Sequence, residues 1–388
     1  MVPAVIRAIR ILRYLQHRGA QGAPLAEVHR ALHLNKSTCY GILKTLEQFG
    51  FVGYSPLSRR YTLGRAAFKL GRTFERRSPQ SRPGVRVSPR RHRHRGWGGM
   101  IPDGFEYIAP KTIAEAVGLI KTHGADAKPL AGGHSLVPLM KLRLAAPRYL
   151  IDLNRIPGMA YIREADGALR IGAMTRHSDL ETSELIKTRY PLLADAARVI
   201  ADPLVRNMGT VGGSLAHADP AGDWGAAMLA ARATVVATGP RGERVIPIDG
   251  FVVDTFQSAL SPDEILTEVR VPQPAARSGG VYLKLERKVG DFAIVAVGAY
   301  VALDGGGKCE HVGIGLCNVG PTSLRAKGAE GRLRGQPPND ATIADAAKAA
   351  AAECDPTTDL RGPAEYKRDM VRVLTARALK RALQKARG

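Results

Sequence analysis

The sequence lacks the residue patterns of disulfide scaffolds, common metal centres and membrane spans. Its four cysteines, Cys39, Cys309, Cys317 and Cys354, are scattered and form no C-x-x-C pair. This spacing excludes a disulfide-stapled scaffold and a zinc or iron–sulfur ligand set. No apolar run approaches the roughly 18 residues of a membrane helix, and the N-terminus shows no signal-peptide pattern. We therefore expect a cytoplasmic protein without a membrane span.

Acidic residues are scarce in the first quarter of the chain. Residues 1–100 carry 20 Lys and Arg against 3 Asp and Glu, whereas residues 101–388 carry 37 against 32. The net charge of +22 therefore belongs mainly to the first quarter, which favours nucleic acid or another polyanion as its partner. With 388 residues, of which 45% are hydrophobic, the chain is long enough for two or three domains.

Residues 1–75 have the pattern of a small helical module. Apolar residues recur at helical spacing from Val5 to Leu15, Asn35 is suited to begin a helix, and Gly50 is suited to end one. Helix, helix, helix and hairpin is the order of a winged helix-turn-helix. The expected elements are helices over 5–15, 24–32 and 35–48 and a hairpin formed by 51–54 and 60–63.

This segment, residues 4–75, resembles the DNA-binding domain of IclR-type transcription regulators, an all-α winged helix-turn-helix module. The resemblance rests on residues 35–38, 43–47 and 60–64, and it implies that the third helix enters the major groove. Gly41 departs from the family, which often has a large polar residue there, so base reading is weakened. The implied DNA contacts are Ser37, Thr38, Tyr40 and Lys44, with Arg59 and Arg60 at phosphate.

Residues 76–100 form a basic linker with eight arginines, no acid and few aliphatic residues. Such a segment cannot bury enough apolar area to become ordered. It could be a basic arm that extends DNA contact over residues 1–95, a join without a role, or a remnant read out of frame, with Met100 as a natural start. We favour a fusion artefact, and peptides of the endogenous protein that span the linker would contradict it.

Two glycine-rich segments, Ala131–Ser135 and Thr210–Ser214, lie 79 positions apart. Small residues allow backbone N–H groups to face an anion. Because both segments are followed by apolar residues in strand-like surroundings, they indicate a dinucleotide site with a pyrophosphate centre. Neither segment fits G-x-G-x-x-G or G-x-x-x-x-G-K-[ST], which excludes Rossmann and P-loop sites.

Strands and helices alternate irregularly after residue 100, which favours an α+β fold over a doubly wound sheet. Thr112 and Glu115 form a capping box at a helix start. Gly313 and Gly315 alternate with apolar residues, which predicts a strand that another backbone approaches closely. The expected strands are 128–131, 149–153, 169–173, 281–286, 293–303 and 310–318, and further helices begin at 177, 342 and 364.

Residues 100–388 resemble the FAD-binding subunits of molybdenum hydroxylases (the xanthine dehydrogenase family), above all the medium subunit of aerobic carbon monoxide dehydrogenase. The resemblance rests on residues 128–136 with Lys141, 206–220 with Asp223, and 286–293. It implies a two-lobed FAD-binding domain of the vanillyl-alcohol-oxidase type over 101–276. A C-terminal α+β domain, a three-stranded sheet with a helix bundle, would cover 277–388.

The resemblance also implies the residues that hold FAD. Backbone N–H groups of 131–136 and 210–213 would hold the pyrophosphate, Asp223 would accept from flavin or ribityl hydroxyls, and Lys284 and Phe292 would lie near the ring system. No residue of this chain is expected to be catalytic or to bind metal. The implied FAD contacts are Lys128, Leu130, Ala131, Gly132, Gly133, His134, Ser135, Leu136, Thr210, Gly212, Gly213, Asp223, Lys284 and Phe292.

As a consequence, the chain is expected to be the FAD-binding electron-transfer subunit of a molybdenum hydroxylase, an oxidoreductase that is incomplete alone. Electrons would come from a [2Fe–2S] small subunit and leave through FAD to an external acceptor. A molybdopterin large subunit would complete a dimer of heterotrimers. Two alternatives stay open: a DNA-binding, flavin-dependent redox-sensing regulator, or a non-functional fusion of an IclR-type fragment with a flavoprotein subunit.

Overall fold

The computed structural model describes residues 3–55, 58–64, 66–67 and 102–388. The chain divides into two compact units, residues 1–92 and 93–388. The expected disordered linker over 76–100 lies outside the described residues. No helix in the described ranges is long and apolar enough to cross a bilayer.

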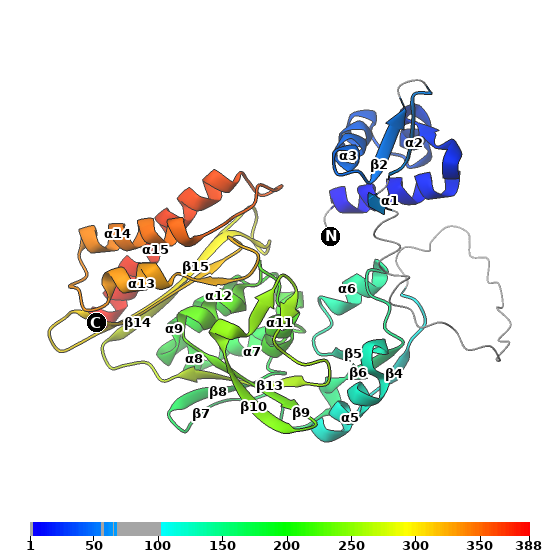
Figure 1. Ribbon diagram of the computed structural model, residues 1–388. Helices are drawn as coiled ribbons and strands as arrows, with labels where there is room; N and C mark the ends of the chain where they lie inside the picture. The colour runs from blue at the N-terminus through cyan, green and yellow to red at the C-terminus, as the bar shows by residue number, and fades with distance from the viewer. Residues whose placement is uncertain (1–2, 56–57, 65, 68–101) are drawn as a thin grey trace. The chain divides into compact units, whose positions relative to one another are not determined.

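The smaller unit has the predicted three helices and hairpin (Figure 1). The Asn35 side chain accepts from the N–H of Ser37 and begins the third helix, and Gly50, with φ of +70°, follows its end. Ile11, Leu15 and Leu43 are buried in its core. The elements are α1 (Pro3–Arg18), β1 (Ala23–Pro24), α2 (Leu25–Ala31), α3 (Lys36–Gln48), β2 (Val52–Ser55) and β3 (Arg60–Leu63), with sheet order β1-β3-β2.

The larger unit begins with a small parallel sheet of order β4-β6-β5, coloured cyan in Figure 1. The Thr112 side chain accepts from the N–H of Glu115 and caps α5 as predicted, but the Glu115 carboxylate accepts from the N–H of Lys111 and not from that of Thr112, so only half of the predicted capping box forms. The parallel pairing is a feature that the irregular order of elements did not suggest. These elements are β4 (Glu106–Ile108), α5 (Ile113–His123), β5 (Ala127–Leu130), α6 (Leu136–Lys141) and β6 (Tyr149–Asp152).

A five-stranded antiparallel sheet of order β10-β9-β13-β8-β7 follows. The helices between its strands bury Leu180, Leu193 and Trp224 in a core shared with the first sheet. The strands are β7 (Ile162–Ala165), β8 (Ala168–Gly172), β9 (Thr234–Gly239), β10 (Gly242–Pro247) and β13 (Ile265–Pro272), and the helices are α7 (His177–Thr182), α8 (Glu184–Arg189), α9 (Pro191–Val199), α10 (Pro203–Arg206), α11 (Val211–His217) and α12 (Asp223–Ala230).

The chain ends in an antiparallel sheet of order β14-β15-β16-β17 with three helices (Figure 1). The three predicted strands form, and a two-residue strand, β17, joins them. A Cβ on Gly313 or Gly315 would lie 1.9 Å from a carbonyl oxygen of α12, so the predicted close backbone approach is confirmed. The elements are β14 (Ser278–Glu286), β15 (Ala293–Leu303), β16 (Cys309–Cys317), β17 (Leu324–Arg325), α13 (Lys327–Leu333), α14 (Asp340–Glu353) and α15 (Ala364–Arg387).

Candidate functional site

The first glycine-rich segment connects β5 to α6 and forms a row of free donors. Within the described chain, none of the backbone N–H groups of residues 132–136 finds an acceptor. Gly133 has φ of +73°, a conformation that glycine adopts without strain. Successive free N–H groups in a turn, just before a helix, suit an anion. We call residues 131–136 the cradle.

The second glycine-rich segment lies directly against the cradle. A Cβ on Gly132 would lie 2.3 Å from the carbonyl oxygen of Met208 and 2.7 Å from the Cα of Gly209. A Cβ on Gly213 would lie 3.3 Å from the Cβ of Ala131. Only glycine at position 132 permits this approach, so the fold brings together two segments that are 79 positions apart in the sequence.

The second segment does not have the strand-like surroundings that we expected, because it begins the helix α11. The Thr210 hydroxyl accepts from the N–H of Gly213 at 3.1 Å and caps this helix. The N–H groups of residues 211, 212 and 214 are likewise bonded to carbonyls of Thr175, Ala173 and Thr210. Backbone donation from 211–213, which the resemblance implied, is therefore already used inside the protein.

A side-chain bridge that no sequence pattern predicts links the two segments. The Asn154 amide donates to the carbonyl of Ala131 at 3.0 Å. The Arg176 guanidinium donates to Asn154 Oδ1 at 2.5 Å and to the carbonyl of Met208. Arg176 thus adds a positive charge beside the cradle. No local pattern marks either residue, because the bridge depends on contacts across 22 and 32 positions of sequence.

His177 supports the second segment from behind. Its backbone N–H donates to the carbonyl of Gly209 at 3.1 Å, and its ring packs against the same glycine. The ring Nδ1 accepts from Trp224 Nε1 at 3.0 Å, which requires a neutral ring with its proton on Nε2. Burial, and then the charge of Arg176, lower the pKa of His177 to about 4. The residue therefore stays neutral at physiological pH.

Asp223 and Lys284 form a buried ion pair. Lys284 Nζ lies 2.9 Å from Asp223 Oδ2 and 2.9 Å from the carbonyl of Val199, and the Tyr282 hydroxyl donates to Asp223 Oδ1 at 3.0 Å. Burial raises the pKa of Asp223, while the Lys284 ammonium opposes that rise. Both carboxylate oxygens thus have partners, and the pair joins the start of α12 to β14.

The other expected FAD contacts occupy varied positions. Phe292 is 49% exposed beside the Arg361 guanidinium, which lies 5.7 Å from its ring centre. His134 and Ser135 are exposed in the cradle, where His134 Nδ1 bonds the carbonyl of Gly132 at 2.9 Å. Lys128 is exposed on β5. The half-buried members are Leu130, Ala131, Gly132, Gly133, Leu136 and Gly213, whereas Thr210 and Gly212 are buried.

The expected DNA contacts lie on α3 and β3. Ser37, Tyr40 and Lys44 are exposed, and Thr38 is half-buried. Lys44 pairs with Glu47 at 3.0 Å. The wing arginine Arg60 donates to the carbonyls of residues 21 and 22 at 3.2 Å, so its guanidinium also holds the wing to the body.

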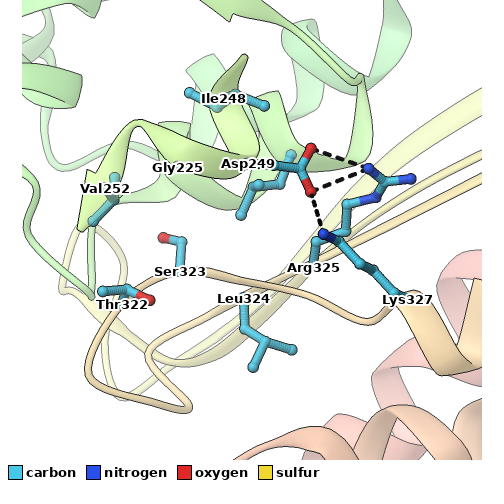
Figure 2. Close-up of a pocket in the computed structure, with 10 residues that line it drawn as sticks. Gly225, Ile248, Asp249, Val252, Thr322, Ser323, Leu324, Arg325 and Lys327 are labelled. Atoms are coloured by element: carbon cyan, nitrogen blue, oxygen red, sulfur yellow. Dashed lines mark hydrogen bonds and ion pairs between the residues drawn. The ribbon is translucent and has the colours of Figure 1, made fainter. Parts of the chain in front are cut away.

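A small cavity of about 220 Å³ lies beside the first turn of α13 (Figure 2). Arg325 and Lys327 line it and both point toward Asp249, at 3.0 and 3.2 Å. Because Asp249 pairs with both cations and Glu330 pairs with Arg325 at 2.7 Å, two carboxylates balance the two charges, and the cavity is a poorer anion site than the cradle.

Known proteins share this architecture. Residues 103–274 match the FAD binding domain in molybdopterin dehydrogenase, 280–382 the CO dehydrogenase flavoprotein C-terminal domain, and 4–56 the IclR helix-turn-helix domain. The chain is 48% identical over 283 residues to the carbon monoxide dehydrogenase medium chain of Hydrogenophaga pseudoflava, covering 73% of this chain and 98% of that protein.

Two further matches agree with it. Identity is 41% over 288 residues to subunit alpha of the 6-hydroxypseudooxynicotine dehydrogenase complex of Paenarthrobacter nicotinovorans, covering 74% of this chain and 97% of that one. Among solved structures, carbon monoxide dehydrogenase from Hydrogenophaga pseudoflava matches with a TM-score of 0.72 over 74% of this chain and 99% of that chain, at 48% identity.

Proposed function

Because this chain belongs to the family of FAD-binding subunits of molybdenum hydroxylases, we propose that it is the electron-transferring flavin subunit of such a complex. The observation that carries the proposal is the cradle, with five consecutive N–H groups that lack an acceptor in the described chain. The chemistry that bound FAD supplies is acceptance of electrons from a [2Fe–2S] subunit and their release to an external acceptor.

The residues of this chain would bind and orient the cofactor. The free N–H groups of residues 132–136 would donate to the pyrophosphate, and the Arg176 guanidinium would add positive charge beside them. Thr210, Gly212 and Gly213 would form the facing wall. The Asp223–Lys284 pair would hold the start of α12 against β14, and Phe292 would offer an aromatic face to the flavin ring.

The partner subunits are the second part of the proposal. A [2Fe–2S] small subunit and a molybdopterin large subunit, in a dimer of heterotrimers, would supply electrons and substrate chemistry. The experiment is affinity purification of the endogenous full-length chain, followed by analysis of iron, molybdenum and flavin in the eluate. We expect iron and molybdenum to elute in fixed proportion to FAD. Elution of the chain with FAD but without either metal would contradict the partners and leave FAD binding intact.

We infer a second role, DNA binding, for residues 4–75. It is supported by the match to the IclR helix-turn-helix domain and by the exposure of Tyr40 and Lys44 on α3. Gly41 is exposed with no side chain to read a base, and Arg60 is already bonded to carbonyls of its own unit. The missing side chain at Gly41 favours contact with phosphates over recognition of one sequence, and Lys44 would make that contact in place of Arg60.

The salt dependence of binding to a short DNA duplex tests this role. The logarithm of the affinity should fall linearly with the logarithm of salt concentration, and Lys44→Ala should make the slope shallower by about one. Lys380→Gln, on the surface of α15, is the control. An affinity that changes with flavin reduction would favour the redox-sensing regulator, whereas no binding at low salt would refute the role.

A further inference from the structure

A large cleft lies in the larger unit, and none of the cradle residues lines it. Its volume of about 680 Å³ falls within the range of roughly 300–1,000 Å³ that small-molecule pockets occupy. It is bounded by the start of α9, the end of α12, the loop after β13 and the sheet of β14, β15 and β16. Clefts of this size at the junction of two packed layers are common ligand sites.

The lining of the cleft is apolar with a basic edge. Leu192, Pro272 and Tyr300 contribute apolar surface. The lining residues contain no Asp or Glu, although residues 101–388 as a whole are nearly balanced in charge. The titratable basic residues among them are Arg189, Arg232, His311 and Lys385. This lining is complementary to a ligand with a flat apolar body and a negative charge.

Two of these cations have N–H donors left for a ligand. Arg232 donates to the carbonyl of Val312 at 2.8 Å, but its nearest carboxylate, on Glu330, is 3.7 Å away and is bonded by Arg325 at 2.7 Å. An arginine has five N–H donors, so several stay open. In contrast, Arg189 is committed to Glu164.

Lys385 is the second such cation. Its Nζ donates to the carbonyl of Gly280 at 3.1 Å and lies 3.6 Å from Asp195. Tyr300 pairs on one side with Gly280, whose carbonyl Lys385 bonds, and on the other with Gly313, which follows the residue whose carbonyl Arg232 bonds. The Tyr300 hydroxyl accepts from the N–H of Ala275 at 3.1 Å, which leaves its own proton free to donate.

We propose that this cleft binds a small aromatic carboxylate, with the ring against Leu192 and Tyr300 and the acid group at Arg232 or Lys385, where the Tyr300 hydroxyl donates to it. The site is independent of the cradle, so the ligand would bind together with FAD. It does not rest on the electron-transfer role proposed above.

Calorimetric titration of the FAD-saturated full-length chain tests this site with two probes of similar shape, 2-naphthoate and the neutral 2-naphthylmethanol. We expect one saturable naphthoate site and at least about tenfold weaker binding of the alcohol, since the alcohol cannot form the charge-assisted hydrogen bonds of the carboxylate. The double variant Arg232→Gln with Lys385→Gln should bind naphthoate at least about tenfold more weakly and should bind the alcohol with unchanged affinity.

Lys380→Gln, which removes an exposed lysine from the same helix outside the cleft, should bind naphthoate as the natural chain does. If the double variant does not fold, Tyr300→Phe keeps the ring and should still weaken naphthoate about fivefold through the lost donor. Absence of saturable binding, equal affinity for both probes, or naphthoate binding unaffected by Tyr300→Phe and the double variant would overturn the proposal.

Discussion

Substitution of His177 by asparagine should remove one pH-dependent contribution to stability. The folded-state pKa of His177 is about 4, against an ordinary value of 6.5, chiefly because the ring is buried. The unfolded chain therefore binds more protons between these values, and stability rises with pH across that window. At about 1.4 kcal/mol per pKa unit, the titration of His177 should lower the free energy of unfolding by about 3 kcal/mol as the pH falls from 7 to 4.

Asparagine at this position does not titrate, yet its amide oxygen, which is two bonds from Cβ as Nδ1 is, can accept from Trp224. The assay is urea unfolding from pH 7.5 to 4.5, followed by the fluorescence of Trp224 in a background with the other tryptophan, Trp97, changed to Phe. The free energies of unfolding of the natural chain and of His177→Asn should differ increasingly below pH 6.5, by about 2 kcal/mol at pH 4.5. Parallel pH profiles would refute the neutral, buried histidine behind the second glycine-rich segment.

Three further substitutions test the cradle and its support. Gly132→Ala should abolish FAD retention, because its Cβ would collide with the facing backbone. The control is Gly118→Ala, in open space on α5, which should keep FAD. Equal flavin content in the two variants would contradict the steric reasoning. Arg176→Ala should lower the affinity for FAD about tenfold in a fluorescence titration, and Arg176→Lys should lower it less. If the two variants bind FAD with the same affinity, the charge has no role. Lys284→Met should lower the free energy of unfolding by about 3–5 kcal/mol by leaving Asp223 buried without its cation, and a loss below about 1 kcal/mol would argue against a buried ion pair.

The sequence was most informative where local chemistry decides the structure. The capping residues Thr112 and Asn35, the helix-ending Gly50 and the alternation of Gly313 and Gly315 all predicted features that the structure has. In each case the signal lies within a few residues and has one physical meaning, such as a side-chain acceptor at a helix start.

Features that depend on long-range contacts were not predictable in the same way. The bridge through Asn154 and Arg176 joins backbone carbonyls that the chain brings together only on folding. The burial of His177 against Trp224 spans 47 positions. The N–H groups after Thr210 were expected to be free, but the start of a helix against residues 173–175 uses them. A short glycine-rich sequence has no local mark that separates an open turn from a packed helix start.

The most direct test of the central claim is the cofactor content of the purified full-length chain. The protein should carry a flavin absorption spectrum, and denaturation should release FAD at about one molecule per chain, identified by chromatography against FAD and FMN. A folded, colourless chain that also fails to take up added FAD would contradict the flavin site at the cradle.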